Sequence, residues 1–132
     1  MISKALLQSA LILSVVTLSG CTVHAPLMVE LSDGTEELRG EAVASLSQGI
    51  FKVSNSQNLS CNGTYNQFTT TAELKVNFKC SDQRTGTVEV MRYGEDLENG
   101  VGIGILSDGV KVRISIGKDI YARDVNKAFN QK

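Results

Sequence analysis

Apolar and polar residues alternate along much of the chain, and this alternation predicts short β-strands. In the clearest stretch the apolar residues Val110, Val112, Ile114 and Ile116 alternate with Lys111, Arg113 and Ser115. Successive side chains of a strand point to opposite faces of its sheet. We therefore expect this strand to have one buried and one solvated face, as in an antiparallel sheet.

Similar stretches recur along the chain and are separated by turns. The predicted strands cover residues 27–31, 37–47, 50–53, 59–65, 74–80, 87–92, 101–106 and 110–116. Asp-Gly pairs in two of the turns are a strong hairpin signal. About eight short strands with regular turn signals predict an all-β fold, a small antiparallel meander that closes into a barrel or a sandwich.

The turns share a short motif. Leu31-Ser32-Asp33-Gly34 recurs as Leu106-Ser107-Asp108-Gly109, and Cys80-Ser81-Asp82-Gln83 is a weaker third copy. We interpret the motif as repeated hairpin chemistry rather than as a repeat array. Its aspartates are better explained as turn formers than as ligands or acids.

The last residues, 118–132, change from strand to helical spacing. Their apolar positions are Ile120, Tyr121, Val125, Ala128 and Phe129. This spacing predicts a short C-terminal helix, with Asp119 as its N-cap. We expect the helix to cover an open sheet edge or a barrel end, and the alternative is a helix that binds a partner.

The N-terminal segment, residues 1–20, has the zones of a secretory signal peptide. Lys4 gives a positive start, a mostly apolar run covers residues 5–18, and the small residues Ser19 and Gly20 follow. The run is too short and too polar for a transmembrane helix, which needs about twenty apolar residues. The remaining residues, 27–132, are enough for a single β-rich domain.

The apolar run ends in Leu18-Ser19-Gly20-Cys21. This motif resembles the lipobox of bacterial lipoproteins, and the chain as a whole resembles small β-rich members of that family. The resemblance implies cleavage before Cys21, lipidation of its sulfur, a membrane anchor and a lipidated tether over residues 21–26. Thr22 stands where an aspartate often signals retention in the inner membrane, so outer-membrane attachment is favoured. An ordinary secretory signal with an incidental Cys21 is the alternative.

The two cysteines left after lipidation are expected to form a disulfide. Cys61 and Cys80 both fall on the apolar face of a predicted strand, and the midpoint between them lies in the polar stretch 66–71. They can therefore face each other across one hairpin. A redox pair or a metal site is disfavoured, because the spacing is not C-x-x-C and the chain's single histidine, His24, lies in the tether.

Composition and charge narrow the function classes. The formal net charge is −1 with no basic run, which argues against nucleic-acid binding. The glycine run at 100–104 lacks the strand-to-helix context of a phosphate loop, so we interpret it as close strand packing. The acidic loop with Glu95, Asp96 and Glu98 lacks the ligand spacing of a calcium loop. No nucleophile–histidine set is present, so we predict no catalytic residues, no cofactor and no metal.

The leading functional hypothesis is a non-catalytic binding or structural module of the cell envelope, with an unidentified envelope protein as partner. An inhibitor of a lysozyme-like enzyme is the alternative, because membrane-bound lysozyme inhibitors are similar in being small, disulfide-bearing β-barrel lipoproteins. A cell-wall hydrolase that uses paired carboxylates is a third hypothesis. Fold similarity alone is a weak argument for function.

Overall fold

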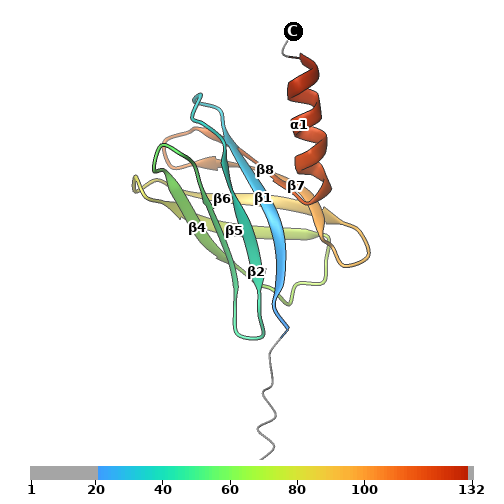
Figure 1. The fold of residues 1–132 in the computed structure, drawn as a ribbon. Coiled ribbons are helices and arrows are strands. Elements are labelled where there is room, and N and C mark those ends of the chain that lie inside the picture. Colours follow the sequence, from blue (N-terminus) through green and yellow to red (C-terminus); the bar gives the residue numbers. More distant parts are fainter. Residues whose placement is uncertain (1–20, 131–132) are drawn as a thin grey trace, which may run out of the picture.

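The computed structural model describes residues 21–130 and shows eight antiparallel strands followed by one helix (Figure 1). The elements are β1 (Val23–Leu31), β2 (Leu38–Ala44), β3 (Gly49–Ser54), β4 (Ser60–Tyr65), β5 (Glu73–Cys80), β6 (Thr85–Tyr93), β7 (Asn99–Leu106), β8 (Lys111–Ile116) and α1 (Lys118–Asn130). Each strand pairs with the next, and β1 pairs with β8 to close the barrel. The all-β prediction is confirmed, and the meander closes as a barrel.

The first strand begins earlier than the sequence pattern indicates. β1 starts at Val23 rather than at residue 27, so within the predicted tether only Cys21 and Thr22 precede it. The added residues extend the pairing with β2, where Val23 lies opposite Ala44. The predicted signal peptide, residues 1–20, lies outside the described residues.

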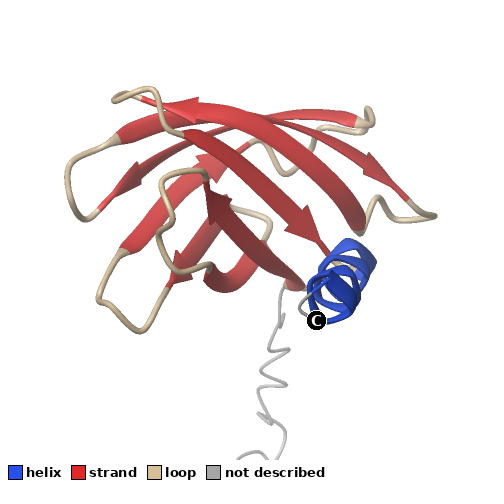
Figure 2. Cartoon of the chain, turned by 90° about the horizontal axis from the view of Figure 1, so that it is seen from above, coloured by secondary structure: helices blue, strands red, loops and turns tan. Residues whose placement is uncertain are grey.

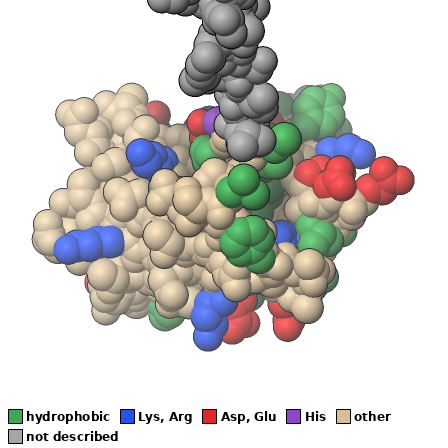
Figure 3. Space-filling model, turned by 90° about the horizontal axis from the view of Figure 1, so that it is seen from below, with side chains coloured by type: hydrophobic (Ala, Val, Ile, Leu, Met, Phe, Trp, Pro, Cys, Tyr) green, Lys and Arg blue, Asp and Glu red, His purple; other side chains and the backbone are tan. Residues whose placement is uncertain are grey.

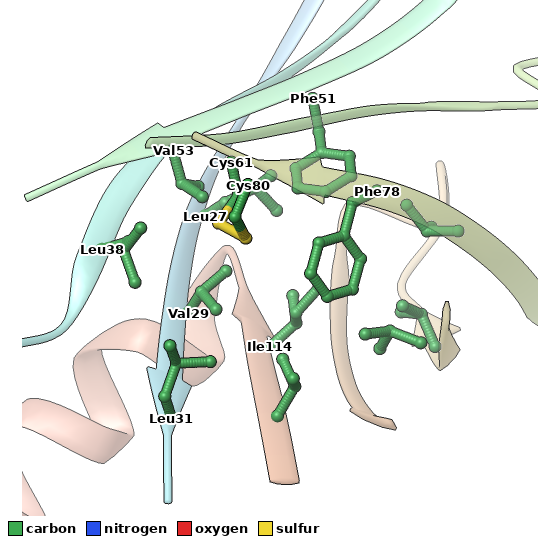
Figure 4. Close-up of a cluster of buried hydrophobic side chains, with 14 of the residues drawn as sticks. Leu27, Val29, Leu31, Leu38, Phe51, Val53, Cys61, Phe78, Cys80 and Ile114 are labelled. Carbon is green, nitrogen blue, oxygen red and sulfur yellow. A yellow bond between two sulfur atoms is a disulfide. The ribbon is translucent and has the colours of Figure 1, made fainter. Parts of the chain in front are cut away.

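The core lies inside the barrel and contains inward-facing side chains of every strand (Figure 4). The rings of Phe51 and Phe78 meet edge to face at its centre, with centroids 5.9 Å apart. Cys61 and Cys80 lie directly opposite each other and form the predicted disulfide. Because the buried apolar residues and the closed ladder all lie between Val23 and Ile116, the polypeptide 22–132 contains the interactions that fold it.

The glycine run of β7 lets the barrel wall close tightly. Gly100, Gly102 and Gly104 occupy inward positions, and side chains from β6 fill the space in front of them. A Cβ on Gly102 would lie 2.8 Å from Cγ1 of Val88. The predicted structural role of this run is confirmed.

The repeated turn motif forms one end of the barrel, which we call the closed end. Ser32 donates its amide to the carbonyl of Lys111, and its Oγ accepts the amide of Lys111. Ser81 and Ser107 repeat this exchange with the neighbouring strand starts, at Ser60 and Thr85. Each serine therefore ties one hairpin to the next around the barrel.

The aspartates of the same motif meet at one guanidinium. Arg84 lies 3.3 Å from Asp33, 2.8 Å from Asp82 and 3.1 Å from Asp108, measured between charged atoms. Each aspartate also accepts the amide of the residue two positions on, which confirms the role as turn formers. Turns far apart in the sequence are thus joined through Arg84.

The helix lies against the outer side of the barrel (Figure 2). The prediction that the helix covers a sheet edge or a barrel end is wrong. β1 and β8 pair and leave no open edge, and the helix lies beside the barrel wall rather than over an end. The predicted N-cap at Asp119 is also wrong. The helix begins at Lys118, whose amide donates to Oδ1 of Asn99, 2.9 Å away. Within the described residues, no helix is long and apolar enough to span a membrane.

Ion pairs hold the helix to the barrel. Arg123 Nε lies 2.9 Å and Lys127 Nζ 3.2 Å from the carboxylate of Glu30 on β1, and Lys127 also pairs with Glu37. Met28 is fully buried although it faces outward beside Glu30 on β1, which places it under the helix. No described residue of the helix is itself buried, so its attachment depends strongly on these charges.

Acid is expected to loosen the helix. Burial favours a higher pKa for Glu30, but hydrogen bonds from Arg123 and Lys127 outweigh burial and hold the pKa below its ordinary value of 4.5. The ion pairs therefore stabilise the attachment fully above that value, and this contribution is lost as pH falls through the lowered pKa. Partly exposed pairs contribute up to about 1 kcal/mol each, so amide-exchange protection in the helix should fall several-fold between about pH 7 and 3.

Two variants provide controls for this prediction. Glu30→Gln should reproduce part of the loss of helix protection at neutral pH and reduce its dependence on pH, because the pairs Lys127–Glu37 and Asp124–Arg39 remain. Glu89→Gln should leave both unchanged, because Glu89 is exposed on the outer face of β6 and makes no ion pair with any described residue. Protection that stays constant through the acid range would contradict the account.

Candidate functional site

The end of the barrel opposite the closed end contains a cavity of about 350 Å³. We call it the open end; it is formed by the start of β1 and by the loops at 45–48, 66–72 and 94–98. The apolar lining consists of Val23, Ala25, Leu27, Ala42, Ala44, Phe51, Leu74, Val76, Val90, Leu97, Ile114 and Ile116. Seen from this side, hydrophobic side chains gather around the end of the barrel (Figure 3).

Small inward residues explain why this half is hollow. Ala25, Ala42 and Ala44 stand on the inner face of β1 and β2 where the core elsewhere has leucine, valine or phenylalanine. Protein interiors are normally packed as densely as organic crystals. A cavity of this volume lies at the small end of the range for ligand sites.

Arg92 is the charged side chain of the inner face of β6, where it follows Val88 and Val90. Its Nη2 donates to the carbonyls of Thr69 and Thr71, at 3.0 and 2.7 Å, and so fixes the loop between β4 and β5. Its Nε is buried and has no hydrogen-bond partner. A buried donor without an acceptor is costly, so an acceptor at this atom would be favourable.

Arg92 also lacks a counterion. It forms no ion pair with any carboxylate in residues 21–130. Burial lowers the pKa of Arg92, and burial likewise raises the pKa of the neighbouring Tyr65. Buried charges in proteins are normally paired, so the guanidinium makes the cavity favourable to an anion.

Other polar residues surround the mouth of the cavity. His24 pairs with Glu41 on the outside, at 3.1 Å. Asp96 and Glu98 of the acidic loop line the rim, and the carboxylate of Glu98 accepts the amide of Asp96 at 3.0 Å. Within the described residues no group of three or more potential ligands could hold a metal ion.

The structure places the predicted site residues at different positions. Cys21 is exposed and lies two residues before β1, at the open end beside the mouth of the cavity. Cys61 and Cys80 lie in the filled part of the core and do not line the cavity. The disulfide is therefore structural, and the open end combines the candidate anchor with the candidate ligand site.

A second apolar surface lies on the outside of the barrel. Val101, Ile103 and Ile105 on β7 are 40%, 67% and 56% exposed. A groove of about 870 Å³ runs along this face, and Arg113 and Arg123 line it together with two of these residues. The helix adds an exposed stripe of Tyr121, Val125 and Phe129.

No protein-family model matches the chain, and neither the curated proteins nor the solved structures give a significant match. Sequence reasoning missed the cavity and Arg92. The alternation of Val88, Val90 and Arg92 would have placed this arginine on the inner face, since residues at every second position of a strand share a face.

Proposed function

We propose that this chain is a lipid-anchored, non-catalytic binding module of the bacterial cell envelope, and that the cavity at the open end is its ligand site. The supporting observation is the apolar cavity of about 350 Å³ with an unpaired guanidinium inside it. Ligand sites are typically concave, mostly apolar and equipped with a few polar groups that fix orientation. The cavity has these properties.

The position of Cys21 supports an orientation for the molecule. A lipid on Cys21 would hold the open end toward the membrane, because only Thr22 separates this cysteine from the first residue of β1. Two or three acyl chains give stable anchoring, since each buried CH₂ contributes about 0.8 kcal/mol. A ligand that partitions into the bilayer would then have a short path to the cavity. Attachment to the outer membrane is part of this proposal.

Binding in the cavity is tested by titrating the oxidised polypeptide 22–132 into the neutral, environment-sensitive dye N-phenyl-1-naphthylamine. We expect saturable fluorescence enhancement with one site per chain. Ala42→Phe fills the cavity and should weaken dye binding by about tenfold or more. Val43→Phe is the matched control, because Val43 is the next residue of the same strand and does not line the cavity. Equal affinities of the two variants would contradict the proposal.

Lipidation is tested in bacteria that express the full chain in the presence of labelled palmitate. The label should enter the protein and remain in the membrane fraction. Cys21→Ser should lose the label and release the domain from the membrane, because the anchor requires the sulfur. A labelled Cys21→Ser variant, or an unlabelled parent chain, would rule out the anchor at Cys21.

The exposed apolar surface on β7 favours a second candidate function, the binding of an envelope protein. Exposed apolar patches often mark sites of protein association. An inhibitor of a lysozyme-like enzyme belongs to this class. Excess polypeptide 22–132 that leaves lysozyme turnover unchanged would remove the inhibitor hypothesis, and capture of one saturable partner from envelope extract would support an unrelated protein partner.

A further inference from the structure

We propose that the ligand of the open end is a single alkyl chain with an anionic head group, whose head binds Arg92 while its chain enters the barrel. This proposal rests on the proposed function, because it names the ligand class of the same cavity. Three observations support it: the apolar lining of the cavity, its small volume and the unpaired guanidinium of Arg92.

The volume favours one chain. A cavity of about 350 Å³ is small among ligand sites. Phe51 lines the cavity, and its ring packs against Phe78 in the core. A small, mostly apolar space of this kind suits a flexible alkyl chain better than a bulky ring system or a complete two-chain lipid.

The charge favours an anion. Arg92 lines the cavity, and its two side-chain hydrogen bonds are to backbone carbonyls, which do not compensate its positive charge. A carboxylate or phosphate would supply the counterion and an acceptor for the orphan Nε. Charge-assisted hydrogen bonds to arginine are among the strong polar contacts in proteins. Tyr65 also lines the cavity, and its hydroxyl group can act as a further donor.

The repulsion of an anionic head group by the acidic residues at the rim does not outweigh its attraction to Arg92. Asp96 and Glu98 are exposed, so their charges are screened by water and salt. Neither carboxylate contributes to the pKa of Arg92. An anionic head therefore gains most when it passes the rim and reaches the guanidinium, which is only partly exposed to solvent.

The experiment displaces N-phenyl-1-naphthylamine from the oxidised polypeptide 22–132 with matched ligands that differ only in their heads. The ligands are decanoate, decyl phosphate, decanol and decylamine at pH 8. We expect decanoate, decyl phosphate or both to bind about tenfold more tightly than decanol, and decylamine to bind more weakly than decanol. Decanoate and decyl phosphate distinguish a carboxylate source from a phosphate source.

Arg92→Gln supplies the second part of the test. The variant should bind decanol within about twofold of the parent chain and should lose the preference for anions. Retained decanol binding also shows that the variant is folded. Equal binding of all heads by the parent chain, or an unchanged preference in Arg92→Gln, would overturn the assignment and leave the cavity as an apolar site. If the dye and every ligand fail to bind, the proposed function fails as well.

Discussion

Gly104→Ala is expected to destabilise the barrel by about 3 kcal/mol, because the added Cβ has no space. It would overlap the carbonyl oxygen of Thr87 and lie 2.9 Å from both Cα and Cγ2 of Val88. Two of these neighbours are backbone atoms of the paired strand β6, which cannot move aside without breaking the ladder. The measurement is urea unfolding of the polypeptide 22–132.

Gly109→Ala is the matched control for this prediction. Gly109 has a φ of +89° in the turn between β7 and β8, and a Cβ there would meet no atom within 4 Å. Its cost is therefore limited to backbone strain, about 1 kcal/mol. If both alanine variants lost the same stability, close packing between β6 and β7 would not be the reason for the glycine run.

Removal of the disulfide is expected to destabilise the domain by about 3 kcal/mol. Cys61 and Cys80 lie 19 positions apart in the sequence, so the bond restricts a sizeable loop of the unfolded chain. Both side chains are also buried at 2% exposure, and Cys61→Ala with Cys80→Ala leaves the core less well filled. This loss is a large share of the stability of a small domain.

The reducing agent provides the control for the disulfide prediction. Dithiothreitol should lower the urea midpoint of the parent polypeptide and should have no effect on the double-alanine variant, since that variant has no bond to reduce. A double variant as stable as the oxidised parent would show that the hairpin of β4 and β5 is fixed by its other contacts alone.

Local pattern was enough to predict the strands and the disulfide. The alternation around Cys61 and Cys80 placed both on the inner face of one hairpin, and the register confirms this. The choice between barrel and sandwich depended on the pairing of β1 with β8, which joins Leu27 to Ile116. Nothing in the two local sequences specifies that pairing, because each strand is equally suited to an edge.

The errors at the helix have the same origin. Aspartate is a residue type favoured at the N-cap, which is why Asp119 was predicted there. The acceptor for the first helical amide is instead Asn99, which is distant in sequence and is brought into place by β7. The convergence of three aspartates on Arg84 was also not predicted, because its pairs with Asp33 and Asp108 cross between hairpins. Sequence motifs indicated the turns, but the partners of their side chains required the closed barrel.

The candidate site was the least predictable feature. The alternation of β6 assigns Arg92 to the inner face, yet a charge at the end of a strand usually lies in solvent. The cavity itself results from alanines on β1 and β2 facing larger residues across the barrel. Such a cavity depends on the sum of many side-chain volumes, so no single sequence motif predicts it.

The most direct test of the central claim is to locate a bound ligand by NMR, with decanoate and the polypeptide 22–132 labelled at its methyl groups. We predict nuclear Overhauser effects from the decanoate chain to the methyl groups of Leu27, Val76 and Val90 inside the barrel. Contacts only to Val101 and Ile103 on the outer face, or no contacts at saturating ligand, would contradict a ligand site at the open end.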